Sequence, residues 1–197
     1  MKIEELHQIF LQCRSVCTDT RKIQKNDLFF ALNGDNFNGN TYANYALKLG
    51  AKYAIIDDPE FDVSEETILV NNALDALQKL ASFHRNYLKV PILAITGRNG
   101  KTTTKELINI IPSQNYKTTA TIGNLNNHIG VPLTLLSMTK DTEIGIVEMG
   151  ANHQKEIEFL SSIAQPDYGY ITNFGKAHLE GFGGVKGVIK GKSELYN

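Results

Sequence analysis

The segment of this 197-residue chain that most constrains its fold is an apolar run followed by a glycine-rich turn and a helical pattern. The run at residues 92–95 leads into Thr96-Gly97-Arg98-Asn99-Gly100-Lys101-Thr102. Glycines let the backbone approach phosphate oxygens, and the N–H groups at a helix start point towards such an anion. Lys101 can reach the terminal phosphates, and the Thr102 hydroxyl can join a Mg²⁺ shell. The segment therefore predicts a strand, a phosphate loop and a helix.

The spacing of this turn leaves one structural alternative. Two residues separate Gly97 from Gly100-Lys101, whereas the common motif has four. A strand–turn–helix corner could also use these glycines only for close packing. We favour nucleotide phosphate binding, because the flanking strand and helix supply the context that the motif requires. The candidate nucleotide-binding residues in this segment are Thr96, Gly97, Arg98, Asn99, Gly100, Lys101, Thr102 and Thr103.

Composition excludes several classes of protein. Hydrophobic residues make up 42% of the chain, which is ordinary for a globular protein with a buried core. Twenty basic residues against 21 acidic ones give no electrostatic footprint for nucleic acid. No apolar run approaches the ~20 residues that span a bilayer, so we expect no membrane insertion. Cys13 and Cys17 lack the second pair of a zinc site and are interpreted as reduced thiols of a cytoplasmic protein.

The first half of the chain predicts a small α/β domain over residues 1–88. Short apolar runs at 28–32, 53–56 and 67–70 are typical of strands. Helical periodicity covers 42–49 and 73–88. His84 lies on the apolar face of the second helix, where a packed, hydrogen-bonded histidine is expected rather than a ligand.

Residues 89–197 predict a second domain with a mostly parallel sheet and a phosphate loop. Strands are expected at 144–149 and 168–172, with a helix at 156–164 between them. Alternating strands and helices favour a parallel sheet covered on both faces, an α/β fold. Ligands of such sheets bind beyond the carboxyl ends of the strands. We therefore expect the three predicted strand ends, Thr96-Gly97, Glu148-Met149-Gly150 and Thr172-Asn173, to meet at one crevice.

Two side chains near these strand ends are candidate metal ligands. Glu148 ends an apolar strand, and its carboxylate suits Mg²⁺, although a solvated strand end is the alternative. His178 follows the last strand in a polar, glycine-rich stretch and is a candidate ligand of a second metal ion. A loop histidine by itself more often has a structural role. His153 could contact substrate or cap a helix, and both interpretations stay open.

Lys192 is expected to lie among apolar residues on a helix over 185–196. The apolar stripe expected on this helix comprises Val185, Val188, Ile189, Leu195 and Tyr196. Desolvation lowers the pKa of a buried lysine and favours the nucleophilic amine, which can react with CO₂ to give a carbamate. A carbamate would be an anionic oxygen ligand. The alternative, which the sequence supports equally well, is a lysine that extends from a packed helix to solvent.

The asparagines Asn124, Asn126 and Asn127 lie between Gly123 and Gly130. Their amides both donate and accept hydrogen bonds, which suits sugar and peptide groups, but such residues also suit ordinary turns.

Together these segments resemble the Mur ligases of peptidoglycan synthesis. The resemblance rests on residues 96–106, 123–132, 148–153 and 177–183, in the order of the family, and spans nearly the whole chain. The segment 123–132 resembles the signature of members that add D-alanyl-D-alanine. Such members would use ATP to convert the carboxylate of UDP-N-acetylmuramoyl-tripeptide to an acyl phosphate, which the amine of D-alanyl-D-alanine then attacks.

The resemblance also implies residue roles. Lys101 would hold ATP phosphates, while Thr102, Glu148 and His178 would serve Mg²⁺ ions. Lys192 would correspond to the lysine that is carbamylated in sister ligases and could then bind metal. Asn173 would contribute to the nucleotide site. The implied substrate-binding residues are Thr20, Arg21, Asn38, Gly39, Asn124, Asn126, Asn127 and Asn152.

The resemblance leaves the exact activity open. The family has three domains, so the resemblance implies that residues 1–88 are the domain that binds the UDP-muramoyl peptide and that residues 89–197 are the first part of the central ATPase domain. We expect this N-terminal part not to turn over by itself. A sister ligase that adds one amino acid, a folylpolyglutamate synthase relative, a non-catalytic UDP-sugar-binding module and a generic phosphate-loop ATPase are the alternatives.

Overall fold

The computed structural model describes residues 1–175 and 182–196. The chain divides into two compact units, Met1–Phe83 and His84–Asn197, and the boundary lies inside helix α3 (Ala73–Leu88). No helix in the described parts of the chain is long and apolar enough to cross a membrane.

The first unit is built on a parallel sheet. Its four strands are ordered β1-β2-β3-β4, in chain order. Helix α2 packs on β3, and the buried side chains of Phe29, Ala54 and Ile56 form part of the core beneath it. The elements are α1 (Ile3–Phe10), β1 (Val16–Cys17), η1 (Thr20–Lys22), β2 (Leu28–Phe30), η2 (Gly39–Tyr42), α2 (Ala43–Lys48), β3 (Tyr53–Ile56), η3 (Pro59–Phe61), β4 (Thr67–Leu69) and α3.

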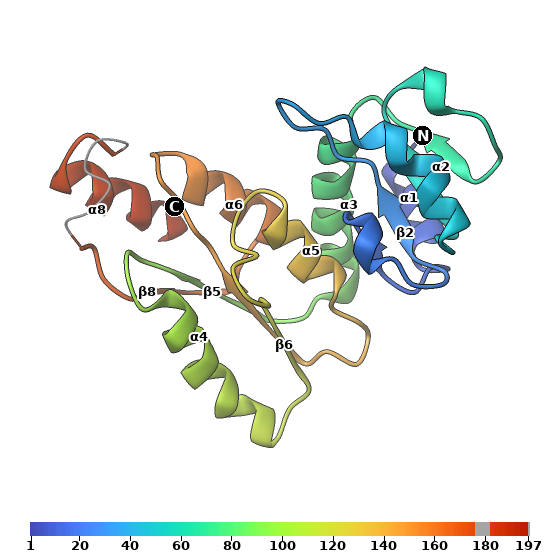
Figure 1. The fold of residues 1–197 in the computed structure, drawn as a ribbon. Coiled ribbons are helices and arrows are strands. Elements are labelled where there is room, and N and C mark those ends of the chain that lie inside the picture. Colours follow the sequence, from blue (N-terminus) through green and yellow to red (C-terminus); the bar gives the residue numbers. More distant parts are fainter. Residues whose placement is uncertain (176–181, 197) are drawn as a thin grey trace. The chain divides into compact units, whose positions relative to one another are not determined.

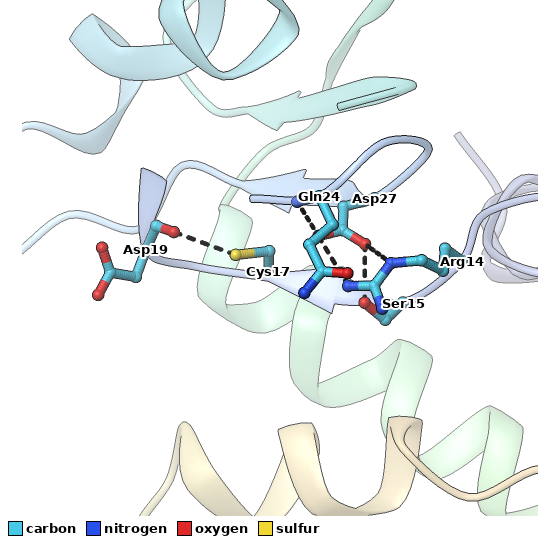
Figure 2. Close-up of polar contacts among 6 residues, drawn as sticks. All are labelled: Arg14, Ser15, Cys17, Asp19, Gln24 and Asp27. Carbon is cyan, nitrogen blue, oxygen red and sulfur yellow. Dashed lines mark hydrogen bonds and ion pairs between the residues drawn. The ribbon is translucent and has the colours of Figure 1, made fainter. Parts of the chain in front are cut away.

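A buried carboxylate holds the start of this sheet together (Figure 2). Asp27 is 1% exposed and accepts hydrogen bonds from the Arg14 guanidinium, the Ser15 hydroxyl and the backbone N–H of Gln24. Because these partners satisfy the charge, Asp27 joins the residues that precede β1 to the segment between β1 and β2. We assign it a structural role.

The second unit also has a parallel sheet, ordered β6-β7-β5-β8. Connections from β5 (Ile92–Thr96) and β7 (Ile144–Glu148) run to opposite sides of β5. Helix α4 (Lys101–Ile110) covers one face, and α5 and α6 cover the other (Figure 1). The remaining elements are η4 (Pro112–Gln114), β6 (Thr118–Ala120), α5 (Gly130–Leu136), α6 (Glu156–Ala164), β8 (Tyr168–Ile171), α8 (Val185–Ser193) and η5 (Glu194–Tyr196).

The register of this sheet brings the strand ends to one edge. Ile95 pairs with Glu148 on one side of β5, and Thr96 pairs with Ile171 on the other. The predicted meeting of three strand ends is therefore confirmed. The predicted strands and the helices at 73–88 and 156–164 are also present. The sequence patterns did not predict α1, β1, β6 or α5.

The apolar stripe predicted for α8 is partly wrong. Val185, Ile189 and Tyr196 are 45%, 44% and 62% exposed, whereas Val188, Lys192 and Leu195 are buried as expected. The helix turns its glycines inward, because Phe182 packs where side chains at Gly187 and Gly191 would lie. Close approach at these glycines rotates the other apolar side chains towards solvent.

Candidate functional site

The turn between β5 and α4 has the backbone of a glycine-dependent anion cradle. Gly97 has φ +136° and Gly100 has φ +75°, in the region that favours glycine. A Cβ on Gly97 would also lie 2.1 Å from the Thr172 hydroxyl. The turn opens α4, whose first N–H groups have no intrahelical partners. This arrangement suits a bound phosphate.

The end of β8 braces this turn from the other side. Arg98 N donates to the Asn173 carbonyl at 3.0 Å, and the Asn173 amide donates to the Asn99 carbonyl at 3.0 Å. The Thr172 hydroxyl donates to the same Asn99 carbonyl at 2.8 Å. Asn173, which the sequence suggested as a nucleotide ligand, therefore also holds the loop in shape.

The cations of the loop are available for an anion. Lys101 Nζ contacts only carbonyls of its own loop in the described parts of the chain, at Gly97 and Arg98. The buried Nε of Arg98 has no hydrogen-bond partner among the described residues. An orphaned guanidinium nitrogen is costly, and an anion in the adjacent cavity would satisfy it.

Glu148 and Thr102 form the polar centre beside the loop. Glu148 is 1% exposed and forms no ion pair with a described residue. The Thr102 hydroxyl donates to its Oε2 at 2.9 Å, and the Asn126 amide donates to its Oε1 at 2.8 Å. A hydroxyl and a carboxylate next to a phosphate cradle are a donor set that Mg²⁺ prefers, with phosphate and water completing the shell. The residues present therefore fit a magnesium ion.

A cavity of about 610 Å³ opens between the loop, the Asn126 segment, the end of β7 and α8. Its polar lining includes Arg98, Lys101, Asn126, Asn127, His128, Asn152, Glu156 and Lys192. Positive groups thus converge on a space next to the predicted phosphate loop. A polyanion with a polar attachment fits this charge and volume.

Lys192 is the buried cation of this cavity. It is 2% exposed, donates to the Ala151 carbonyl at 3.0 Å and lies over the Phe182 ring. Burial, together with the positive charge of Lys101, lowers the pKa of Lys192 to about 8, while the negative charge of Glu156 opposes the shift. A substantial fraction of the amine is therefore neutral near pH 8.

The turn before α6 is held by Glu156. Its carboxylate accepts from Asn152 N at 2.6 Å and from His153 N at 3.1 Å. Burial disfavours its charge, yet these hydrogen bonds prevail and keep the pKa of Glu156 below its ordinary value. Asn152 reaches the cavity, while His153 is exposed and contacts Glu156.

Several predicted site residues have local structural contacts. The Thr96 hydroxyl donates to the Met149 carbonyl, and Thr103 is exposed on α4. Asn127 accepts from the N–H groups of Ile129 and Gly130 at the start of α5. Asn124 is exposed and does not line the cavity. His178 lies outside the described residues.

A second cavity, of about 480 Å³, lies in the first unit. Thr20, Arg21 and Gly39 line it together with the stacked rings of Phe37 and Tyr42. The Asp19 carboxylate accepts from Arg21, and this contact holds the pKa of Asp19 at about 2. Asn38 does not line the cavity and instead accepts from Asn40 within η2. Exposed aromatic rings beside an arginine suit a nucleobase with an attached phosphate.

Two further polar residues support the site and were not predicted from the sequence. The Thr121 hydroxyl accepts from Glu148 N, and Glu194 caps α6 by accepting from Lys155 N and Glu158 N. Thr121 follows a three-residue edge strand and Glu194 lies in a short 3₁₀ turn, so neither has a periodic signal.

Comparisons with known proteins identify the family. The profile described as the Mur ligase middle domain matches residues 95–197, more than half of the chain. The chain belongs to the Mur ligase family. A second profile, described as Mur ligase family, catalytic domain, matches residues 12–85. These matches confirm the resemblance drawn from the motifs.

Curated members of the Mur ligase family are similar over most of this chain. A Bacillus subtilis protein named UDP-N-acetylmuramoyl-tripeptide--D-alanyl-D-alanine ligase is 40% identical over 184 residues, which is 92% of this chain. An Escherichia coli protein of the same name is 38% identical over 193 residues, or 98% of this chain. The chain spans only 40% and 42% of these two relatives.

Solved Mur ligase structures share the fold. A crystal structure of MurF from Acinetobacter baumannii has a TM-score of 0.86 at 34% identity and covers 99% of this chain, which spans 46% of that protein. MurF ligase from Thermotoga maritima, in complex with ADP, has a TM-score of 0.81 at 32% identity over 94% of this chain and 43% of its own. The α/β fold with parallel sheets is confirmed.

Proposed function

We propose that this chain forms part of a ligase that joins D-alanyl-D-alanine to UDP-N-acetylmuramoyl-tripeptide at the expense of ATP. The first unit would bind the UDP end of the substrate, and the second would bind ATP. The names of the relatives support this substrate pair. A cytoplasmic location follows from the proposed use of ATP.

The observation that carries the proposal is the contact between Thr102 and Glu148 beside the Gly97–Gly100 turn. ATP would supply the phosphoryl group that activates the tripeptide carboxylate as an acyl phosphate, and Mg²⁺ would neutralise phosphate charge. Glu148 and Thr102 would hold the ion, and the N–H groups that open α4 would bind phosphate oxygens. Lys101 would exchange its loop carbonyls for the terminal phosphates.

Lys192 and Arg98 would complete the electrostatics of the cavity. The neutral amine of Lys192 would add to CO₂ and release a proton to solvent, which gives an anionic carbamate ligand in place of a buried ammonium. Arg98 would donate its unpartnered Nε to a phosphate or carboxylate oxygen. Asn126, Asn127 and Asn152 would contact peptide or sugar groups at the other wall.

The decisive activity test uses the complete ligase that contains this chain. ADP release is measured with UDP-N-acetylmuramoyl-tripeptide and either D-alanyl-D-alanine or single amino acids. We expect release with the dipeptide only. Release with a single amino acid would instead support a sister ligase.

A binding test on the 197-residue chain separates the two units. Calorimetry should detect both the UDP-linked muramoyl peptide and Mg-ATP. Binding of the UDP compound alone would favour a non-catalytic UDP-sugar-binding module.

A further inference from the structure

Helix α4 buries a lysine that the proposed chemistry does not use. The side chain of Lys105 is 1% exposed, whereas Leu107 and Ile110 on the same helix are 61% and 55% exposed. Lysine is almost never fully buried unless it is paired, because removing an ammonium from water is costly. A helix that turns its lysine inward and its apolar residues outward requires a specific partner for that lysine.

The partner is the carbonyl that follows β6. Lys105 Nζ donates to the Thr121 carbonyl at 2.5 Å and pairs with Glu106 Oε1 at 2.8 Å. An apolar side chain at position 105 would leave the Thr121 carbonyl without this donor. A buried carbonyl that loses its hydrogen-bond partner is destabilising.

Thr121 in turn holds the backbone of Glu148. Its N–H donates to the Ile146 carbonyl, and its hydroxyl accepts from Glu148 N at 2.9 Å. On the other side, Met149 N donates to the Ile95 carbonyl. The end of β7 is therefore held between β5 and Thr121, which directly follows the edge strand β6.

Lys105 thus links both halves of the proposed metal site. Thr102 lies one turn earlier on α4 and donates to the Glu148 carboxylate. Asn126, which donates to the other carboxylate oxygen, lies in the segment that begins after Thr121. Lys105 fixes the distance between the helix that carries the hydroxyl and the strand ends that carry the carboxylate.

We propose that Lys105 is a positioning residue, which acts through Thr121 to hold Glu148 in place for a divalent cation at the phosphate loop. This role rests on the proposed nucleotide site. Lys105 contacts neither nucleotide nor metal in this account. Its loss should therefore weaken metal binding without weakening the contacts of nucleotide phosphates with the loop.

The test compares the chain with its Lys105→Met variant. Isothermal titration measures the affinity for ADP in the presence of EDTA and then the affinity for Mn²⁺ at saturating ADP. We expect Lys105→Met to weaken Mn²⁺ binding about tenfold or more and to leave ADP binding in EDTA within about twofold. A general loss of structure would weaken both equally.

Three further variants test whether Lys105 acts on Glu148 through Thr121. Lys105→Arg keeps a charged donor and should restore most of the Mn²⁺ affinity. Thr121→Val removes the hydroxyl that accepts from Glu148 N and should reproduce the loss. Lys117→Met makes the same chemical change at a lysine that is 71% exposed and should change neither affinity.

The double variant Lys105→Met/Thr121→Val tests whether the two residues act through one another. If the two residues act through one another, the double variant should lose no more Mn²⁺ affinity than the single variant that loses more. Independent effects would instead add. Unchanged Mn²⁺ affinity in Lys105→Met, an equal loss of ADP affinity in EDTA, or additive losses would overturn the proposal. Failure of the unmodified chain to bind ADP and Mn²⁺ would refute the nucleotide site itself, and this role with it.

Discussion

The Thr102 hydroxyl donates a 2.9 Å hydrogen bond to the buried carboxylate of Glu148, which lies 46 residues later in the chain. We predict that Glu148→Gln loses Mn²⁺ affinity by at least about tenfold and yet folds as stably as the unmodified chain. The amide can keep both hydrogen bonds, since a hydroxyl also accepts, and it removes a buried charge. Titration calorimetry and thermal unfolding measure both quantities.

The matched control is Glu143→Gln, because Glu143 is exposed and lies outside the cavity. It should leave Mn²⁺ affinity unchanged. Equal Mn²⁺ affinity in Glu148→Gln and the unmodified chain would remove Glu148 from the metal site.

Gly97→Ala should destabilise the loop by more than the conformational cost of a positive φ, because it also introduces a steric clash. The new Cβ would meet the Thr172 hydroxyl at 2.1 Å, and φ is +136°. We expect a loss of more than about 2 kcal/mol in unfolding free energy, with loss of ADP binding. Denaturant unfolding and calorimetry provide the measurements.

Gly123→Ala is the control that measures the conformational cost of a positive φ without a steric clash. This glycine has φ +57° and no atom within 4 Å of an added Cβ, so we expect a loss of only about 1 kcal/mol. Similar losses at the two positions would show that Gly97 is not sterically restricted by Thr172.

Lys192 should form a carbamate that depends on pH. Because its pKa is lowered to about 8, the neutral amine increases as pH rises through that value. At a fixed CO₂ pressure, ¹³C-labelled CO₂ should therefore give a carbamate signal in the NMR spectrum that grows between about pH 7 and 9. The signal should vanish in Lys192→Met and persist in Lys190→Met, which removes an exposed lysine of the same helix. A signal that survives Lys192→Met would belong to another amine.

His84 should make the protein less stable in acid. Burial lowers the pKa of His84 below its ordinary value, although its hydrogen bond with the Met138 carbonyl opposes the shift. Below about pH 6.5 the unfolded chain therefore binds more protons at this residue than the folded chain, and unfolding free energy decreases as pH falls. Denaturant titrations at pH 7.5 and 5.5 should show a smaller decrease for His84→Gln than for the unmodified chain. Equal decreases would contradict this origin.

Much of the second unit was predictable because its signals are local. The strand before Gly97 and the helix after Gly100 follow from an apolar run, two glycines and a lysine. The parallel sheet follows from alternating strand and helix periods. Since carboxyl ends of parallel strands share one edge, the meeting of Glu148 with Thr102 could be predicted without knowledge of the register.

The remaining contacts depend on tertiary structure. Periodicity would place Leu107 and Ile110 of α4 in the core, but the helix buries Lys105 against the Thr121 carbonyl instead. Likewise, glycines that pack against Phe182 set the rotation of α8, and no apolar pattern reports this contact. Short edge strands and side chain–backbone contacts between distant segments have no sequence period.

The central claim is that the turn at residues 97–102 cradles nucleotide phosphates beside a metal held by Glu148. Anomalous diffraction from crystals of this chain with ADP and Mn²⁺ tests it most directly. We predict a Mn²⁺ peak in contact with the Glu148 carboxylate and the Thr102 hydroxyl, with phosphate oxygens on the N–H groups that open α4. Phosphates bound at another surface, or a Mn²⁺ peak remote from Glu148, would contradict it.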